Sequence, residues 1–336
     1  MTAAAALTRR WYRSRLCALT ALLVPASWLY GAVVRVRRGL YAAGWMKRRR
    51  VARLVVVVGN LTVGGGGKTP AAIALARALA ARGAAPGLVS RGYGGRSRTP
   101  REVRPDDDPA IVGDEPLILA RSGFPVVVGR DRAAAAELLI ARHPQTSVIV
   151  CDDGLQHLAL ARDVEIVVVD DARGFGNGWL LPAGPLREPA SRLAQVDAIA
   201  RLADAQASAG DASADGRETR IVHRALPWRR VGDDAEVAGA PGCWRGARVA
   251  ALAGIAHPQR FFATLRAQGI DAATTALDDH HAFTPADLPA DADVVLMTEK
   301  DAVKCRRFDD PRLHYLPIEA VIDPRLVERV AALIAA

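Results

Sequence analysis

The sequence predicts an α/β protein in which a doubly wound, mostly parallel sheet forms the main domain and a second, smaller α/β domain follows. Three observations predict this fold. Short valine-rich runs alternate with alanine-rich helical stretches along most of the 336 residues. A glycine-rich loop stands directly between one apolar run and the next helical stretch. A polar, aperiodic segment over 204–219 then separates two series of strand–helix units.

The first series begins with the continuous apolar run at 54–58, which is typical of a strand buried on both faces. A helix over 70–81 follows and is ended by Gly83. The other elements expected in this series are strands at 87–90, 125–128, 147–151 and 165–169 and a helix over 132–141. Alternating strands and helices imply a parallel sheet that binds ligands at the carboxyl ends of its strands.

The second series contains strands at 248–252 and 293–297, a helix over 258–268, and a closing helix over 324–335. We place the boundary between the two series near 205–225, in the aperiodic segment. The chain is therefore expected to have three parts: an N-terminal helical segment over 1–50, the main domain over 51–220, and a smaller C-terminal α/β domain over 221–336.

The composition limits the possible partners and the compartment. The formal net charge is +9 and the isoelectric point is near 9.9, which indicates an anionic partner such as a phosphate group, an acidic membrane surface or a nucleic acid. The four cysteines (Cys17, Cys151, Cys243 and Cys305) are far apart and form no CxxC pair. This spacing argues against a zinc site or a disulfide framework and fits a reducing compartment.

The glycine-rich loop is the strongest functional signal. The sequence VVVVGNLTVGGGGKTP at 55–70 follows a strand and opens a helix, which is the context of a P-loop in an NTPase-like fold. Backbone N–H groups of Thr62, Val63 and the glycines Gly64, Gly65, Gly66 and Gly67 are expected to surround the ATP phosphates. Lys68 is expected to reach the β- and γ-phosphates, and the Thr69 hydroxyl to bind Mg²⁺. Thr62 stands where the usual motif has its first glycine.

Two acidic strand ends are candidates for a second magnesium ligand. The expected strand at 147–151 runs into Asp152 and Asp153, and the strand at 165–169 runs into Asp170 and Asp171. A carboxylate in this position can hold Mg²⁺ directly or through water, or it can cap the following turn. We favour Asp152 and Asp153, because the polar cluster GLQH follows them at 154–157.

The N-terminal segment contains an uncharged apolar stretch at 16–34 between two arginine-rich flanks. A spanning helix needs about 20 apolar residues, so the length is just sufficient. A cleaved signal peptide fits poorly with the nucleotide loop that follows. A helix packed inside the protein is a further alternative. Because both flanks are basic and Pro25 interrupts the stretch, we favour a helix lying in or partly entering the bilayer, with arginines on anionic headgroups.

Taken together, these motifs resemble those of the tetraacyldisaccharide 4'-kinase family of lipid A biosynthesis. The matching segments occur in order along nearly the whole chain: VGNLTVGGGGKTP (58–70), SRGYGG (90–95), VGDEP (112–116), DDGLQH (152–157), LLPAGPLREP (180–189), GIAHPQRF (254–261), DHHAF (279–283) and MTEKDAVKC (297–305). The family's variant loop also carries the unusual Thr62. The chain departs from the family at Gly66, where threonine is more common.

The resemblance implies an activity and its catalytic residues. It implies that the γ-phosphate of ATP is transferred, with Mg²⁺, to the 4'-hydroxyl of a tetraacyldisaccharide 1-phosphate, a late step of lipid A biosynthesis. It places the family's catalytic aspartate at Asp114 and its supporting histidine at His280, with Lys68 acting on the phosphates. It also implies location at the cytoplasmic face of the inner membrane, through a monotopic or single N-terminal helix and anionic lipids.

The resemblance further suggests which residues hold the acceptor. Arg91, Tyr93 and His157 match positions that bind the substrate headgroup. An arginine can bind the 1-phosphate through two hydrogen bonds, and a sugar can lie on the tyrosine ring. Arg187 and Glu188 match positions near the nucleotide or the metal. The TEKD segment at 298–301 is read equally well as a structural turn or as a functional element.

Three other classes compete with this interpretation. A P-loop GTPase or metallochaperone would carry a guanine-reading motif with a residue between its lysine and aspartate, and the TEKD segment lacks that residue. A partitioning ATPase would carry a lysine where this loop has Val63. A nucleic-acid-binding protein is suggested only by the charge. The arginines gather around the apolar N-terminal stretch, so we expect a membrane and no nucleic acid.

Overall fold

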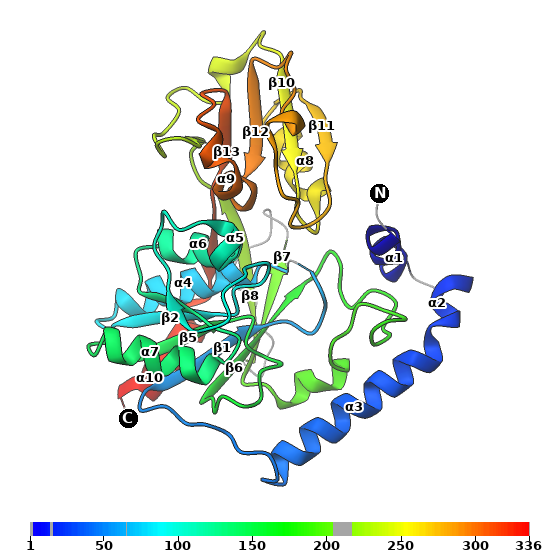
Figure 1. Ribbon diagram of the computed structural model, residues 1–336, viewed down its shortest axis with the longest axis vertical. Helices are drawn as coiled ribbons and strands as arrows, with labels where there is room; N and C mark the ends of the chain where they lie inside the picture. Colours follow the sequence, from blue (N-terminus) through cyan, green and yellow to red (C-terminus); the bar gives the residue numbers. More distant parts are fainter. Residues whose placement is uncertain (1–2, 14–15, 65, 204–216, 336) are drawn as a thin grey trace.

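The computed structural model describes residues 3–13, 16–64, 66–203 and 217–335. Within these residues the chain forms two lobes, each built on its own sheet (Figure 1). The strands of the large sheet are β1 (Leu54–Gly59), β2 (Pro86–Ser90), β3 (Arg101–Glu102), β4 (Val126–Val128), β5 (Val148–Asp152), β6 (Val164–Asp170), β7 (Ala198–Ala203), β8 (Glu218–Ala225) and β14 (Ile318–Ile322). The helices beside it are α4 (Lys68–Ala80), α5 (Pro109–Val112), α6 (Asp114–Arg121), α7 (Arg132–Arg142) and α10 (Pro324–Ala335).

The large sheet has the order β14-β8-β7-β6-β1-β5-β2-β4-β3 in the described residues. All neighbouring strands are parallel except β3 with β4 and β14 with β8. Successive side chains of β1 point to opposite faces of the large sheet, and helices cover both of these faces. Val56 and Val58 pack in the core that includes α4, α6 and α10, whereas Val55 and Val57 pack in the core that includes α7. The predicted α/β fold with a large, mostly parallel sheet is therefore confirmed.

The small lobe contains β9 (Arg229–Arg230), β10 (Val249–Ala253), β11 (Ala273–Ala276), β12 (Val294–Thr298) and β13 (Leu313–Leu316), with α8 (Pro258–Ala267) and α9 (Glu299–Cys305). Its order is β11-β10-β12-β13-β9, and only β9 is antiparallel to its neighbour. The apolar side chains of α8 pack in one core cluster, and Ala302 and Cys305 of α9 pack in another. This lobe is thus also covered by helices on both faces.

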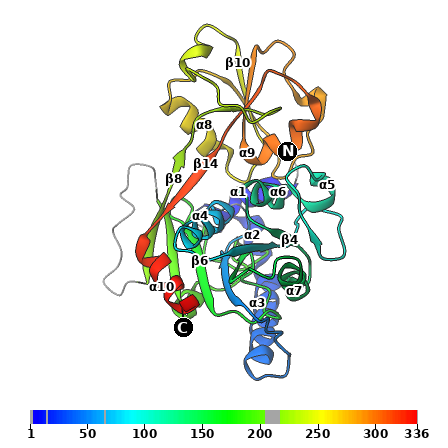
Figure 2. The same ribbon diagram turned by 90° about the vertical axis from the view of Figure 1, so that its left-hand side faces the viewer.

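The sheets do not follow the predicted division at residue 220. β8 lies within the large sheet but extends toward the small lobe, and β14 returns beside it, as Figure 2 shows. α10 then packs on the large lobe, where Leu326, Val327 and Val330 are buried in the same core as Val56. The segment 318–335, which was expected in the C-terminal domain, therefore completes the large lobe. Sequence patterns could not place it there, because an edge strand and a terminal helix look alike in either lobe.

The N-terminal segment forms α1 (Ala3–Trp11), α2 (Ala18–Leu22) and α3 (Val24–Ala42). Pro25 lies in the first turn of α3, where its missing N–H breaks no hydrogen bond, so the apolar stretch divides before it. Ser27, Gly31 and Tyr41 face the protein and are buried, whereas most other side chains of α3 are exposed. No helix in the described part of the chain is both long and apolar enough to cross a membrane. Because most of its side chains are exposed, α3 is not a fully buried packing helix.

Candidate active site

The loop between β1 and α4 contains two glycines whose backbone conformation favours glycine. Gly64 and Gly67 have φ angles of 97° and 78°, in the left-handed region that favours glycine. A Cβ at Gly67 would lie 3.0 Å from Leu202 Cδ2, and one at Gly66 would lie 3.0 Å from Asn60 Nδ2. At Gly66 a side chain would therefore have to displace the end of the Asn60 side chain slightly. The expectation for Gly65 falls outside the described residues.

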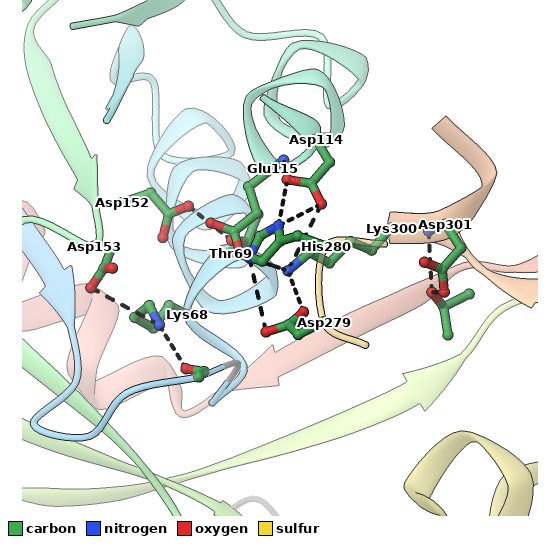
Figure 3. Close-up of polar contacts among 12 residues, drawn as sticks. Lys68, Thr69, Asp114, Glu115, Asp152, Asp153, Asp279, His280, Lys300 and Asp301 are labelled. Atoms are coloured by element: carbon green, nitrogen blue, oxygen red, sulfur yellow. Dashed lines mark hydrogen bonds and ion pairs between the residues drawn. The ribbon is translucent and has the colours of Figure 1, made fainter. Parts of the chain in front are cut away.

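Lys68 and Thr69 begin α4 and reach the acidic end of β5 (Figure 3). Lys68 Nζ donates to Gly64 O at 3.3 Å and stands 4.0 Å from Asp153 Oδ1. Thr69 Oγ1 donates to Asp152 Oδ2 at 2.8 Å. The structure thus brings together the glycine loop, Lys68, Thr69 and the favoured acidic pair.

Asp152 has properties that suit a cation ligand. Its side chain is fully buried, and burial followed by the charge of Glu115 raises its pKa to about 7. Its Oδ1 atom has no hydrogen-bond partner among the described residues. No group of three or more His, Cys, Asp or Glu side chains in the described segments could hold a metal by itself. Mg²⁺ fits this donor set, since it is commonly held by one or two protein oxygens plus phosphates and water.

Asp153 is held differently from its neighbour. Arg187 Nη1 and Nη2 donate to its two oxygens at 3.1 and 2.9 Å. Burial alone would raise the pKa of Asp153, but the charges of Lys68 and Arg187 lower it far below the usual range. Arg187 also donates to Thr62 O at 3.1 Å, so one guanidinium ties the loop to Asp153. Asp152 is therefore the freer of the two carboxylates toward a metal.

Asp114 and His280 come from different lobes and meet in the structure. His280 Nδ1 lies 3.0 Å from Asp114 Oδ2 and 3.2 Å from Oδ1. Asp114 begins α6 directly after Gly113, whose φ of 94° belongs to glycine. Burial alone would raise the pKa of Asp114, but the hydrogen bond with His280 and the charge of Lys300 lower it. The carboxylate is therefore ionised at neutral pH.

The three expected headgroup residues have different neighbours. Tyr93 is 59% exposed, and its ring centroid lies 4.9 Å from that of His280. Arg91 is exposed, and His157 is partly buried with its pKa lowered to about 4, first by burial and then by the charge of Arg132. Arg132 also interacts electrostatically with Arg91. Tyr93 thus lies beside the acid–histidine pair, whereas Arg91 and His157 lie near a buried arginine.

Sequence reasoning missed Arg132 and left the position of Glu188 open. Arg132 is 5% exposed and donates to Asp153 O at 2.8 Å. Only its place at the start of an amphipathic helix was visible in the sequence. Glu188 is 4% exposed, accepts a hydrogen bond from Gln156 Nε2 at 3.0 Å, and pairs with Arg38 of α3. It therefore links the N-terminal helix to the DDGLQH segment.

Asp170 and Asp171, the alternative candidates for the magnesium ligand, form ion pairs with arginines. Asp170 accepts hydrogen bonds from both Nη atoms of Arg260 at 3.0 and 3.1 Å. Arg260 belongs to α8 of the small lobe, so this ion pair joins the two lobes. Asp171 binds Arg201 at 3.1 Å. The oxygens of Asp170 are thus occupied, unlike the free Oδ1 atom of Asp152.

These features define a two-lobed α/β protein with a glycine-rich loop between β1 and α4 and an aspartate–histidine pair that joins the lobes. A family model described as tetraacyldisaccharide-1-P 4'-kinase matches residues 19–335. A tetraacyldisaccharide 4'-kinase of Chromobacterium violaceum is 49% identical over 96% of both chains, and one of Thiobacillus denitrificans is 46% identical over 92% of this chain and 94% of the relative.

The fold is also similar to that of a solved structure from the same family. A crystal structure described as the "apo" form of LpxK from Aquifex aeolicus in complex with ATP has a TM-score of 0.79 and 26% identity, covering 94% of this chain and 98% of that one. The chain belongs to the tetraacyldisaccharide-1-P 4'-kinase family. The predicted resemblance is confirmed, and membership of this family does not favour the GTPase and partitioning-ATPase alternatives.

Proposed function

We propose that this protein is an ATP-dependent kinase that transfers the γ-phosphate of ATP to the 4'-hydroxyl of a tetraacyldisaccharide 1-phosphate in lipid A biosynthesis. The observation that carries the proposal is the Asp114–His280 pair, which lies near the Lys68–Thr69 end of the glycine loop (Figure 3). The charge of Glu115, adjacent to Asp114, acts on Asp152, so the pair and the acidic strand end are neighbours. Relatives bearing the kinase name match nearly the whole chain.

In the proposed reaction Asp114 accepts the proton of the acceptor hydroxyl. Its lowered pKa keeps it ionised, and the contact with His280 orients it. Loop backbone N–H groups and Lys68 bind the transferring phosphoryl group and offset its charge. Arg187, fixed on Asp153, adds a second cation beside the loop. The acceptor is expected to bind across Tyr93, with Arg91 and His157 near its phosphate.

Mg²⁺ is proposed as the metal, with Thr69 and Asp152 as its protein ligands and Asp153 positioned by Arg187. The support is the free, fully buried Oδ1 atom of Asp152 beside the Thr69 hydroxyl. When bound, Mg²⁺ would neutralise phosphate charge and orient the γ-phosphoryl group. The oxygen-only donor set suits a hard cation better than zinc.

We also propose that α2 and α3 attach the protein to anionic lipids at the cytoplasmic face of the inner membrane. The support is a surface with large exposed apolar side chains on α2, on α3 and just after it: Leu22, Trp28, Leu29, Val33, Val36 and Trp45. Exposed basic residues at 47–50 follow. The opposite stripe of α3 packs on the protein, where Ser27 Oγ donates to Leu180 O at 2.7 Å. This arrangement suits a helix lying in the interface.

The activity is tested by phosphate transfer from ATP to the disaccharide 1-phosphate in detergent micelles, with GTP as a comparison. We expect product with ATP, and a loss of kcat of about 10²-fold or more in Asp114→Asn with little change in ATP affinity. Lys68→Ala is expected to lose both activity and nucleotide affinity. Absence of product from the intact chain, or preference for GTP, would refute the proposed reaction.

A further inference from the structure

Lys300 lies in the small lobe, in the first turn of α9, and reaches across to the large lobe. Its side chain is only 15% exposed. Nζ donates to Glu115 Oε1 at 3.2 Å and to Asp279 Oδ1 at 3.4 Å, and stands 3.3 Å from His280 Nε2. It is also 4.0 Å from Asp114 Oδ2. One ammonium therefore contacts both members of the acid–histidine pair and a carboxylate beside each of them.

The contact with His280 determines how that ring is protonated. A charged ammonium carries three donors and no acceptor, so the imidazole nitrogen facing it must accept. Nε2 is then without a proton, and the ring proton resides on Nδ1. Nδ1 faces Asp114 and donates to its carboxylate. The ionised Asp114 can only accept, so both contacts of the ring, with Asp114 and with Lys300, place its proton on Nδ1.

The ammonium remains charged in this position. Burial alone would lower the pKa of Lys300, but the carboxylates of Glu115, Asp279 and Asp114 outweigh it and raise that pKa above the ordinary value. The imidazole is contacted by Asp114, Asp279, Lys300 and the ring of Tyr93, and Glu115 binds the same ammonium. Within this group Lys300 supplies the positive charge that keeps the carboxylates together.

The small lobe holds Lys300 and His280 on one rigid framework. Asp301, the residue after Lys300, accepts hydrogen bonds from Gly254 N at 3.0 Å, Lys304 Nζ at 2.7 Å and Thr298 Oγ1 at 2.7 Å. The carbonyl of Gly254 in turn accepts from His280 N at 3.2 Å. The segments that carry Lys300 and His280 are therefore hydrogen-bonded to each other through Gly254, directly after β10.

We propose that Lys300 is a positioning residue for the acid–histidine pair: it fixes the imidazole of His280 so that Nδ1–H donates to Asp114. Lys300 thereby acts through His280 rather than on the substrate. The inference rests on the proposed kinase function, because Asp114 must be the proton acceptor for the effect on kcat to appear. It also gives the TEKD segment a role beyond its turn.

The test measures the effect of replacing Lys300 in the original protein and again in a His280→Ala variant. The assay is phosphate transfer from ATP to the disaccharide 1-phosphate by the full chain. Lys300→Met keeps the apolar length of the side chain and removes the charge. We expect kcat to fall about tenfold or more, with KM for ATP within about twofold of the original. In a His280→Ala background the same substitution is expected to change kcat by less than about twofold. Lys300→Arg should recover part of the lost kcat.

Two controls separate positioning from general damage. Arg121→Met removes a different interlobe ion pair, Arg121 with Asp234 at 3.4 Å, and is expected to leave kcat within about twofold. Thermal unfolding of each variant checks folding. If Lys300→Met does not fold, Lys300→Gln takes its place in the same comparison, with the same expected factors.

The outcomes that would overturn the inference are specific. A kcat of Lys300→Met within about twofold of the original would refute the positioning role. An equal loss of kcat in the original protein and in the His280→Ala variant would also refute it, because Lys300 would then act independently of His280. An active chain with either result refutes only this inference. A chain that forms no product at all refutes the proposed kinase function, and the inference with it.

Discussion

Asp152→Asn is expected to make the metal-free protein more stable at pH 8 while abolishing phosphate transfer. Asp152 is fully buried at the end of β5, and its pKa is raised from 3.8 to about 7 by burial and by the charge of Glu115. An unfolded chain ionises this carboxyl near its ordinary value. The folded chain therefore binds one more proton than the unfolded chain between about pH 4 and pH 7, and its stability falls as pH rises through that window.

The size of the effect follows from the shift of about 3 units. At 1.36 kcal/mol per unit, the ionised carboxylate costs the folded state about 4 kcal/mol above pH 7. Asparagine removes that cost and can still accept the hydrogen bond that Thr69 donates. In the variant the asparagine NH₂ group takes the place of the unpaired Oδ1 and has no acceptor. Burying this unpaired donor costs the folded state about 1–3 kcal/mol. We expect a net gain of about 1–3 kcal/mol at pH 8.

The measurement is urea unfolding of both proteins in EDTA at several pH values from 5 to 8.5. The advantage of the variant should grow as pH rises from 5 to about 7 and then level off. Adding Mg²⁺ and ATP should stabilise the original protein and have little effect on the variant, because binding to the folded state adds to its stability. A difference in unfolding free energy that stays constant from pH 5 to 8.5 would refute the assignment of a buried, repelled carboxylate at Asp152.

Three further predictions concern other parts of the site. Gly113→Ala should lower kcat about tenfold with ATP affinity retained, since a Cβ there would lie 2.5 Å from Tyr93 O; unchanged steady-state kinetics would contradict this. Arg187→Lys keeps the charge but loses the bidentate contact with Asp153, so the affinity for Mg²⁺–ATP should fall about tenfold. Calorimetry measures this affinity, and an unchanged value would argue against the contact. Leu29→Asp on the exposed face of α3 should weaken sedimentation with anionic vesicles about tenfold, with activity on micellar substrate less affected; unaltered binding would exclude this face.

Most of the large sheet was predictable because its strands are buried on both faces. The strands expected at 54–58 and 147–151 correspond to β1 and β5, and the helix expected over 132–141 corresponds to α7. These elements carry continuous apolar runs or a helical period, so local pattern and tertiary environment agree. The strands β3, β7, β8 and β14 and the helices α5 and α6 were not predicted. α6 has only eight residues and carries Pro116 in its first turn, so the sequence offered too short a stretch to read as a helix.

The sequence alone determined the glycine loop, its lysine and threonine, and the acidic strand end, because each role depends on residues close together in the chain. It also determined the family, through motifs in a fixed order. The meeting of Asp114 with His280, and of Lys300 with both, was decided only by the tertiary structure. These residues lie in two lobes, and lobe packing sets which side chains meet across 166 positions of sequence. The return of 318–335 to the large lobe was decided in the same way, by strand pairing between distant segments.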